Sequence, residues 1–89
     1  MLETNNNLSI EFVSHPGDTL LELLNQYGIS QKELAVKTET DEQYIDDVIN
    51  GKESITVAFA KKLETVLKPK AYFWINRQTI YDEKVAMYC

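Results

Sequence analysis

Amide and carboxylate side chains gather in one short stretch, KTETDEQYIDDVINGK, which spans residues 37–52. At the helical spacing of about 100° per residue, its outward face centres on Gln43, Asp46, Asp47 and Asn50. A Gln or Asn amide can make two hydrogen bonds to the edge of an adenine, and an Asp can accept one from the amino group of cytosine. These residue types at this spacing therefore suit base reading in a DNA groove.

The charge of the same stretch opposes that task. Its acidic residues are Glu39, Asp41, Glu42, Asp46 and Asp47. The whole chain has 14 acidic residues against 9 Lys and Arg, which gives a net charge of -5. Because most DNA affinity comes from Lys and Arg contacts with phosphate, we expect any DNA binding to be local and specific. The alternative is a solvated acidic face on a helix that has lost a DNA role.

Other kinds of chemical site have little support in the sequence. The single His and the single Cys, His15 and Cys89, do not give the spacing of zinc ligands, and the three glycines are scattered rather than grouped in a phosphate loop. No nucleophile constellation accompanies His15, for which we expect a structural or surface role. A chain of 89 residues has room for four or five helices and none for a sizeable catalytic cavity. We therefore expect no enzyme activity, no metal and no cofactor.

A first helix is predicted between the turn HPGD and Gly28. Pro16 or Asp18 can open it, and its apolar residues recur at i, i+3, i+4 and i+7. These residues are Leu20, Leu23, Leu24 and Tyr27. Residues 1–14 are expected to form a polar tail that includes a short extended segment, SIEFV.

Two short helices follow, joined by a turn of three or four residues. Ser30 and Glu33 form a capping box for the first, and Asp41 can cap the second, which ends at Asn50 and Gly51. The residues expected to face inward are Leu34, Ala35, Ile45, Val48 and Ile49. Two helices at this spacing predict a helix-turn-helix at residues 30–50.

Two further helices complete the predicted fold. In SITVAFAKKLETVLK an apolar stripe predicts a helix that stops before Pro69, and the stripe consists of Val57, Ala60, Leu63 and Leu67. Four lysines lie in this region and the next turn: Lys61, Lys62, Lys68 and Lys70. They either contact a phosphate backbone or only offset the negative charge of the chain.

The last helix, residues 70–88, carries apolar residues at intervals of seven. They form a seam two residues wide: Phe73, Ile80 and Met87 beside Trp74, Tyr81 and Tyr88. So late in a small chain the seam has little left to pack on, which favours a homodimer or partner interface as much as a simple core. The predicted interface residues are Trp74, Tyr81, Val85, Met87 and Tyr88, and for Trp74, beside Phe73, a place in the core is the favoured alternative. In a fragment of a longer protein, the seam would instead meet the next domain.

Four motifs, HPGDTLLELL, SQKELA, VINGKESIT and FWINRQ, make the chain resemble the HigA and VapI-type addiction-module antidote proteins. The similarity runs from about His15 to Tyr81. It implies an all-α, five-helix, lambda-repressor-like domain over residues 15–89. Members of that family bind operator DNA as dimers, repress transcription of their own operon and neutralise a toxin protein, so the resemblance implies these roles as well.

The resemblance also implies particular roles for single residues. Gln31 would contact a phosphate, and Ala35 is the small residue that lets the two helices cross closely. The residues assigned to DNA binding are Gln31, Gln43, Tyr44, Asp47, Asn50 and Lys52. Glu39 stands at the turn position where the family usually has Gly, and it would cost about 1 kcal/mol if that position still needs a positive φ.

Two expectations concern the setting of the chain. Similar sequences also form the N-terminal domain of longer ImmA/IrrE-type metallopeptidases, so the alternative function is a protein-interaction module that has lost DNA binding. No apolar run approaches the roughly 18 to 20 residues of a membrane span, and the N-terminus lacks the order of a secretory signal. We therefore expect a cytoplasmic protein that does not contact a membrane.

Overall fold

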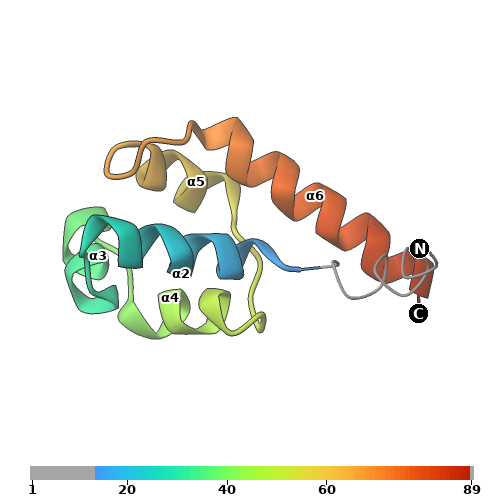
Figure 1. Ribbon diagram of the computed structural model, residues 1–89, viewed down its shortest axis with the longest axis horizontal. Helices are drawn as coiled ribbons and strands as arrows, with labels where there is room; N and C mark the ends of the chain where they lie inside the picture. The colour runs from blue at the N-terminus through green and yellow to red at the C-terminus, as the bar shows by residue number, and fades with distance from the viewer. Residues whose placement is uncertain (1–13, 89) are drawn as a thin grey trace, which may run out of the picture.

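The computed structural model describes residues 14–88, and over that range the chain forms five α-helices and no strand (Figure 1). The helices are α2 (Pro16–Tyr27), α3 (Gln31–Thr38), α4 (Glu42–Ile49), α5 (Val57–Glu64) and α6 (Ala71–Tyr88). The predicted all-α, five-helix fold is confirmed. The extended segment predicted for SIEFV lies outside the described residues.

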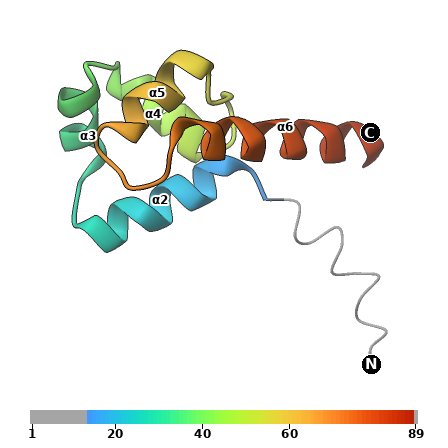
Figure 2. The same ribbon diagram turned by 90° about the horizontal axis from the view of Figure 1, so that it is seen from above.

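The helices pack around one core. α2 packs on α4 and α6, α3 packs on α4 and α5, and α5 runs along the first part of α6. In Figures 1 and 2 the C-terminal half of α6 extends beyond the other helices, and the buried residues of α6, Trp74 and Gln78, lie in its first half. The fully buried side chains that form this core come from every helix and include Leu20, Leu24, Leu34, Ile45, Val48, Leu63 and Trp74.

The capping signals read from the sequence are confirmed at the end of α2 and at the starts of α3 and α4. Gly28 ends α2 with a left-handed φ of 69°. The Ser30 hydroxyl accepts a hydrogen bond from the Glu33 amide at 3.0 Å, and the Asp41 carboxylate accepts one from the Gln43 amide at 3.1 Å. Each cap satisfies an N–H group that would otherwise lack a partner at a helix start.

Gly17 allows the first turn of α2 to lie directly on α4. A Cβ atom placed on Gly17 would overlap the carbonyl oxygen of Val48. Only a residue without a side chain therefore permits this helix crossing. The contact involves backbone on both sides, so neither helix can give way by a change of rotamer.

The stripe predicted for the fourth helix is partly wrong. Thr56 caps α5 by accepting a hydrogen bond from the Phe59 amide at 3.1 Å, and the helix ends at Glu64, well before Pro69. Val57 is 54% exposed, and Phe59 takes the inward position instead. Because the cap places Val57 in the first turn, facing solvent, the buried stripe runs through Phe59, Ala60 and Leu63. Leu67 is buried, but in the loop after the helix.

The seam predicted for the last helix is also partly wrong. Trp74 is fully buried and belongs to the core, so it cannot be an interface residue as predicted. The inward side of α6 follows Trp74, Gln78 and Tyr81, at i, i+4 and i+7, and the half-buried Tyr81 packs on His15. Met87 lies off this stripe and is 77% exposed. Of the two columns of the predicted seam, the one through Trp74 and Tyr81 faces inward, whereas Ile80 and Met87 of the other column are exposed.

Candidate nucleic-acid interface

α3 and α4 are joined by a tight turn whose strained residue is Glu39. Its φ of 51° and ψ of 47° place it in the left-handed region, so the condition on which its expected cost depends is met. The next amide, of Thr40, donates to the carbonyl oxygen of Ala35 at 2.9 Å. The Nζ atom of Lys62 lies 3.5 Å from the Glu39 carbonyl oxygen, so α5 also contacts the turn. The turn thus directs α4 across α3, with buried Ala35 on the inner side of α3.

The outward face of α4 presents the amides and carboxylates expected from the sequence. Gln43 and Asn50 are exposed, and Asp46 and Asp47 are half-buried. The Nε2 atom of Gln43 donates to Oδ1 of Asp47 at 3.0 Å, and Nδ2 of Asn50 donates to the carbonyl oxygen of Asp46 at 2.9 Å. Each amide is held along the helix and keeps its oxygen and a second N–H free to meet a base edge.

Tyr44 has a different position from the one expected of a base reader. Its hydroxyl donates to the carbonyl oxygen of Ser54 at 2.6 Å and accepts from the amide of Thr56 at 3.3 Å. Its ring packs edge-on against Phe59, with 5.1 Å between ring centroids. The hydroxyl is therefore engaged within the chain, where it holds the loop that follows α4.

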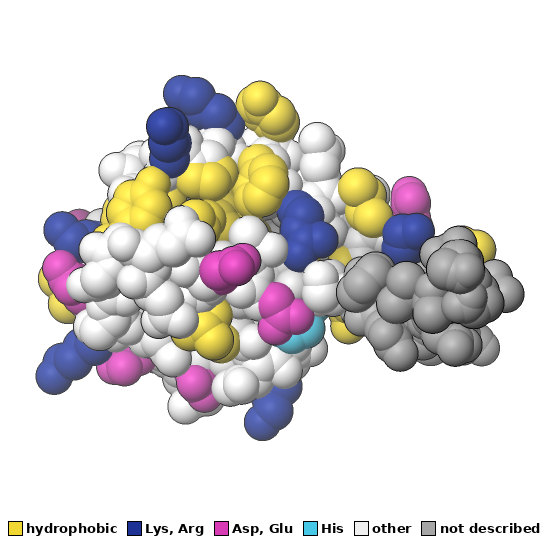
Figure 3. Space-filling view, viewed as in Figure 1, with side chains coloured by type: hydrophobic (Ala, Val, Ile, Leu, Met, Phe, Trp, Pro, Cys, Tyr) yellow, Lys and Arg dark blue, Asp and Glu magenta, His cyan; other side chains and the backbone are white. Residues whose placement is uncertain are grey.

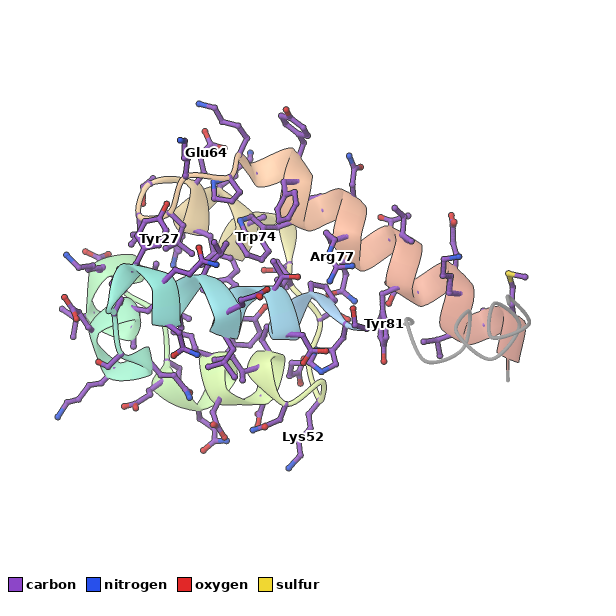
Figure 4. All side chains as sticks on the ribbon, in the orientation of Figure 1. Tyr27, Lys52, Glu64, Trp74, Arg77 and Tyr81 are labelled. Atoms are coloured by element: carbon purple, nitrogen blue, oxygen red, sulfur yellow. The ribbon has the colours of Figure 1, made fainter. Side chains whose placement is uncertain are left out.

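The other two sequence-predicted contacts lie at the ends of this surface. Gln31 is half-buried at the first position of α3, and Lys52 is exposed in the loop after α4. Figure 4 shows Lys52 pointing away from the body of the molecule at the end of α4. A helix N-terminus and a lysine each attract an anion, so both positions have the chemistry expected of a phosphate contact.

Sequence reasoning missed the residues that support this surface from α6. Oε1 of Gln78 accepts a hydrogen bond from the amide of Ile55 at 2.8 Å, and Arg77 donates to Oγ1 of Thr19 at 2.9 Å. His15, for which only a structural or surface role was expected, is the N-cap residue of α2, and its ring packs edge-on on Tyr81 with 6.0 Å between ring centroids. No signal in the local sequence pattern identifies these contacts, because they join segments far apart in the chain.

Other site types find no support in the part of the chain that the structure describes. Among residues 14–88 there is no group of three or more His, Cys, Asp or Glu side chains placed to hold a metal ion. None of the described helices combines the length and the apolar character needed to cross a membrane. Figure 3 shows the face of the molecule seen in Figure 1. Acidic and basic side chains are dispersed over it, and an apolar area lies beside basic side chains at its upper edge.

Comparison with known proteins places this arrangement in a family. Residues 20–81 match the family model described as helix-turn-helix. The chain is 33% identical over 73 residues to virulence-associated protein I of Dichelobacter nodosus, a match that covers 81% of this chain and 68% of that protein.

Solved structures of antidote and antitoxin proteins are also similar to this chain. An addiction module antidote protein of the HigA family from Coxiella burnetii is 32% identical, with a TM-score of 0.77 over 84% of this chain and 83% of that one. The antitoxin HigA of Pseudomonas aeruginosa, solved with the higBA promoter, is 28% identical, with a TM-score of 0.78 over 82% and 80% of the two chains. The matched part of the present chain includes α3, the turn and α4.

Proposed function

This chain belongs to the helix-turn-helix family, and on that premise we propose that it is a DNA-binding transcriptional regulator of antitoxin type. It represses by occupying an operator as a dimer and performs no chemistry of its own. The observation that carries the proposal is the α3–turn–α4 unit, whose outward face presents the Gln43 and Asn50 amides. The similarity to a HigA antitoxin solved with promoter DNA supports it.

In the proposed complex α4 lies in the major groove. Gln43 and Asn50 each hydrogen-bond an adenine edge, and Asp47 orients Gln43 while its second oxygen can accept from a cytosine amino group. Gln31 and Lys52 contact phosphates on either side. A bidentate contact between an amide and a base contributes about 1–3 kcal/mol of discrimination, so two such amides suffice for a preferred sequence.

The acids on α4 make this binding selective rather than general. Asp46 and Asp47 approach the phosphates with the same sign of charge, and Lys52 offsets only part of the repulsion. Affinity for random DNA is therefore low, while base contacts and a second half-site restore affinity at the operator. Tyr44 contributes by holding the loop that carries Lys52 rather than by reading a base.

The projecting half of α6 is the proposed surface for a second copy. Met87 and Ile80 are 77% and 48% exposed, and Tyr81 and Val85 remain half-buried beside them. A second α6 that covers these residues would remove apolar surface from water and bring two α4 helices onto one duplex. Tyr88 stays a predicted member of this surface, and a toxin protein stays a predicted partner.

A titration with two labelled duplexes tests the proposal. One duplex covers the region immediately upstream of the coding sequence, and the other has the same composition in scrambled order. We expect the chain to prefer the upstream duplex and Gln43→Ala to lose about 10- to 100-fold of that preference, the equivalent of one bidentate contact. Gln26→Ala is the matched control, because Gln26 is exposed on α2 outside the helix-turn-helix. Equal affinity of the unaltered chain for both duplexes would overturn the proposal.

A further inference from the structure

The loop between α4 and α5, residues 50–56, is held from two sides. On one side Tyr44 of α4 bonds to Ser54 and Thr56 through its hydroxyl. On the other side the amide of Ile55 donates to Oε1 of Gln78 at 2.8 Å, and both residues are buried, with exposures of 4% and 9%. The loop that follows α4 is thus connected to both α4 and α6.

The orientation of the Gln78 amide depends on a residue at the surface. Its Nε2 atom donates to Oδ1 of Asp82 at 2.9 Å, one turn further along α6. An amide has a donor end and an acceptor end, so a flipped Gln78 would turn its N–H groups toward the Ile55 N–H and its oxygen toward the carboxylate. Asp82 therefore selects the orientation in which Gln78 can accept from Ile55. Asp82 is itself exposed and lies in the C-terminal half of α6.

We propose that Asp82 and Gln78 are positioning residues for α4, acting through a line of hydrogen bonds from the surface of α6 to the loop after α4. The line runs from Asp82 to Gln78, then to the Ile55 amide, and from the adjacent residues of the loop to the Tyr44 hydroxyl. That α4 is the helix so positioned for DNA rests on the proposed function. A cationic group of a partner that pairs with the Asp82 carboxylate would weaken the hydrogen bond between Asp82 and Gln78. Its effect on the loop would then equal that of removing the carboxylate.

The physical reason is that the Ile55 amide has no access to water when its partner is lost. A buried N–H without an acceptor is costly, so the loop must shift until the amide reaches solvent or another acceptor. A shift of Ile55 moves its neighbours Ser54 and Thr56, which share the Tyr44 hydroxyl. Lys52 lies in the same loop and moves with them.

Amide hydrogen exchange followed by NMR tests the line of bonds without DNA. In Asp82→Ala we expect the Ile55 amide to exchange about three- to tenfold faster, as the weakening of one hydrogen bond implies, with shift changes at Tyr44 and Thr56. The Leu24 amide reports global unfolding and should stay unchanged. Glu83→Ala is the matched control, because it removes an exposed acid from the neighbouring position. Unchanged exchange at Ile55, or an equal effect in the control, would overturn the proposal.

A swap of the two side-chain types provides a second test. Gln78→Glu keeps an acceptor for Ile55 but places a carboxylate against the Asp82 carboxylate, which should speed exchange at Ile55. Adding Asp82→Asn places an amide N–H donor opposite the new carboxylate at position 78. The pair then keeps the net charge of the original one. We expect the double variant to return Ile55 exchange to within about twofold of the unaltered chain, since both hydrogen bonds can form again. Failure of this rescue would show that the bond between the two side chains does not matter.

Binding to the upstream duplex tests the effect on α4. Gln78→Met is neutral and similar in size, and we expect it to weaken binding about three- to tenfold without changing the slope against salt, because no phosphate contact is removed. Thr79→Ala, at an exposed neighbouring position, should bind as the unaltered chain does. Unaltered affinity in Gln78→Met would overturn the positioning role. If the exchange results hold but the unaltered chain shows no preference for the upstream duplex, the proposed function fails and so does the assignment of DNA to this helix.

Discussion

Gln43 and Asp47 are paired along the outward face of α4, with 3.0 Å between Nε2 and Oδ1. The pairing satisfies one carboxylate oxygen within the helix and fixes the direction of the amide that we assign to base reading. It does not remove the charge of Asp47, which still faces any phosphate that α4 approaches. Substitution of Gln43 therefore tests the role of the amide, and charge reversal at Asp47 tests the role of the negative charge.

Charge reversal on α4 should convert selective binding into general binding. We expect the unaltered chain to bind random duplex DNA no better than about 10⁻⁴ M at physiological salt. Asp46→Lys combined with Asp47→Arg should bind the same DNA more tightly and with a steeper dependence on salt, because two attractive phosphate contacts replace two repulsive ones. Fluorescence anisotropy at several salt concentrations measures both quantities.

A control for that experiment makes the same change of charge elsewhere. Glu22→Lys combined with Glu83→Lys alters exposed positions on α2 and α6, outside the helix-turn-helix. It should gain less affinity than the α4 variant and show a smaller change in salt dependence. If the α4 variant binds no duplex, α4 does not approach DNA and the acidic face belongs to a scaffold with another role.

Glu39→Gly should stabilise the protein. Glu39 has a φ of 51°, which costs a residue with a Cβ atom about 1 kcal/mol relative to Gly. We expect the free energy of unfolding to rise by up to about 1 kcal/mol. The larger conformational entropy of Gly in the unfolded chain offsets part of this gain. Urea denaturation measures the change. Glu42→Gly is the control with the opposite sign, since Glu42 is the first residue of α4, where Gly has a lower helix propensity and the acidic side chain favoured at a helix N-terminus is lost. A lowered midpoint for Glu39→Gly would mean that its side chain makes compensating contacts.

Gly17→Ala should destabilise the protein strongly. The added methyl group would overlap the Val48 carbonyl oxygen, so α2 must move away from α4 at a cost of about 1–3 kcal/mol. Gly28→Ala separates this overlap from backbone strain, because Gly28 has a φ of 69° but no atom within 4 Å of an added Cβ. We expect Gly28→Ala to lose only about 1 kcal/mol. Thermal or urea unfolding should rank Gly17→Ala as the less stable, and the reverse order would contradict the close crossing.

Met87→Glu should shift self-association toward the monomer. Met87 is 77% exposed on the projecting half of α6, so the new charge cannot disturb the core but would be buried in a dimer that uses this face. Sedimentation at high micromolar concentration measures the change. Asn76→Glu adds the same charge to an exposed position in the first half of α6 and should leave association unaltered. A monomeric unaltered chain at these concentrations would refute the dimer.

The sequence by itself determined the elements that depend on neighbouring residues. Ser30 and Asp41 cap helices because a side-chain oxygen meets an amide two or three positions away, and Gly28 ends α2 because only nearby backbone is involved. The strained turn at Glu39 could likewise be placed from its position in a resembling motif. The inward residues of α3 and α4 followed from the helical spacing of their apolar side chains.

Only the tertiary structure decided which face the later helices bury and which polar groups they satisfy. Periodicity shows that residues share a face, but the packing partner determines which face is inside, so Phe59 is buried instead of Val57. The Tyr44 hydroxyl and the Gln78 amide find their partners 10 and 23 residues away in the chain. Such contacts exist only once α4, α6 and the loop between α4 and α5 are brought together, because a hydrogen bond depends on distance in space and not on separation in sequence.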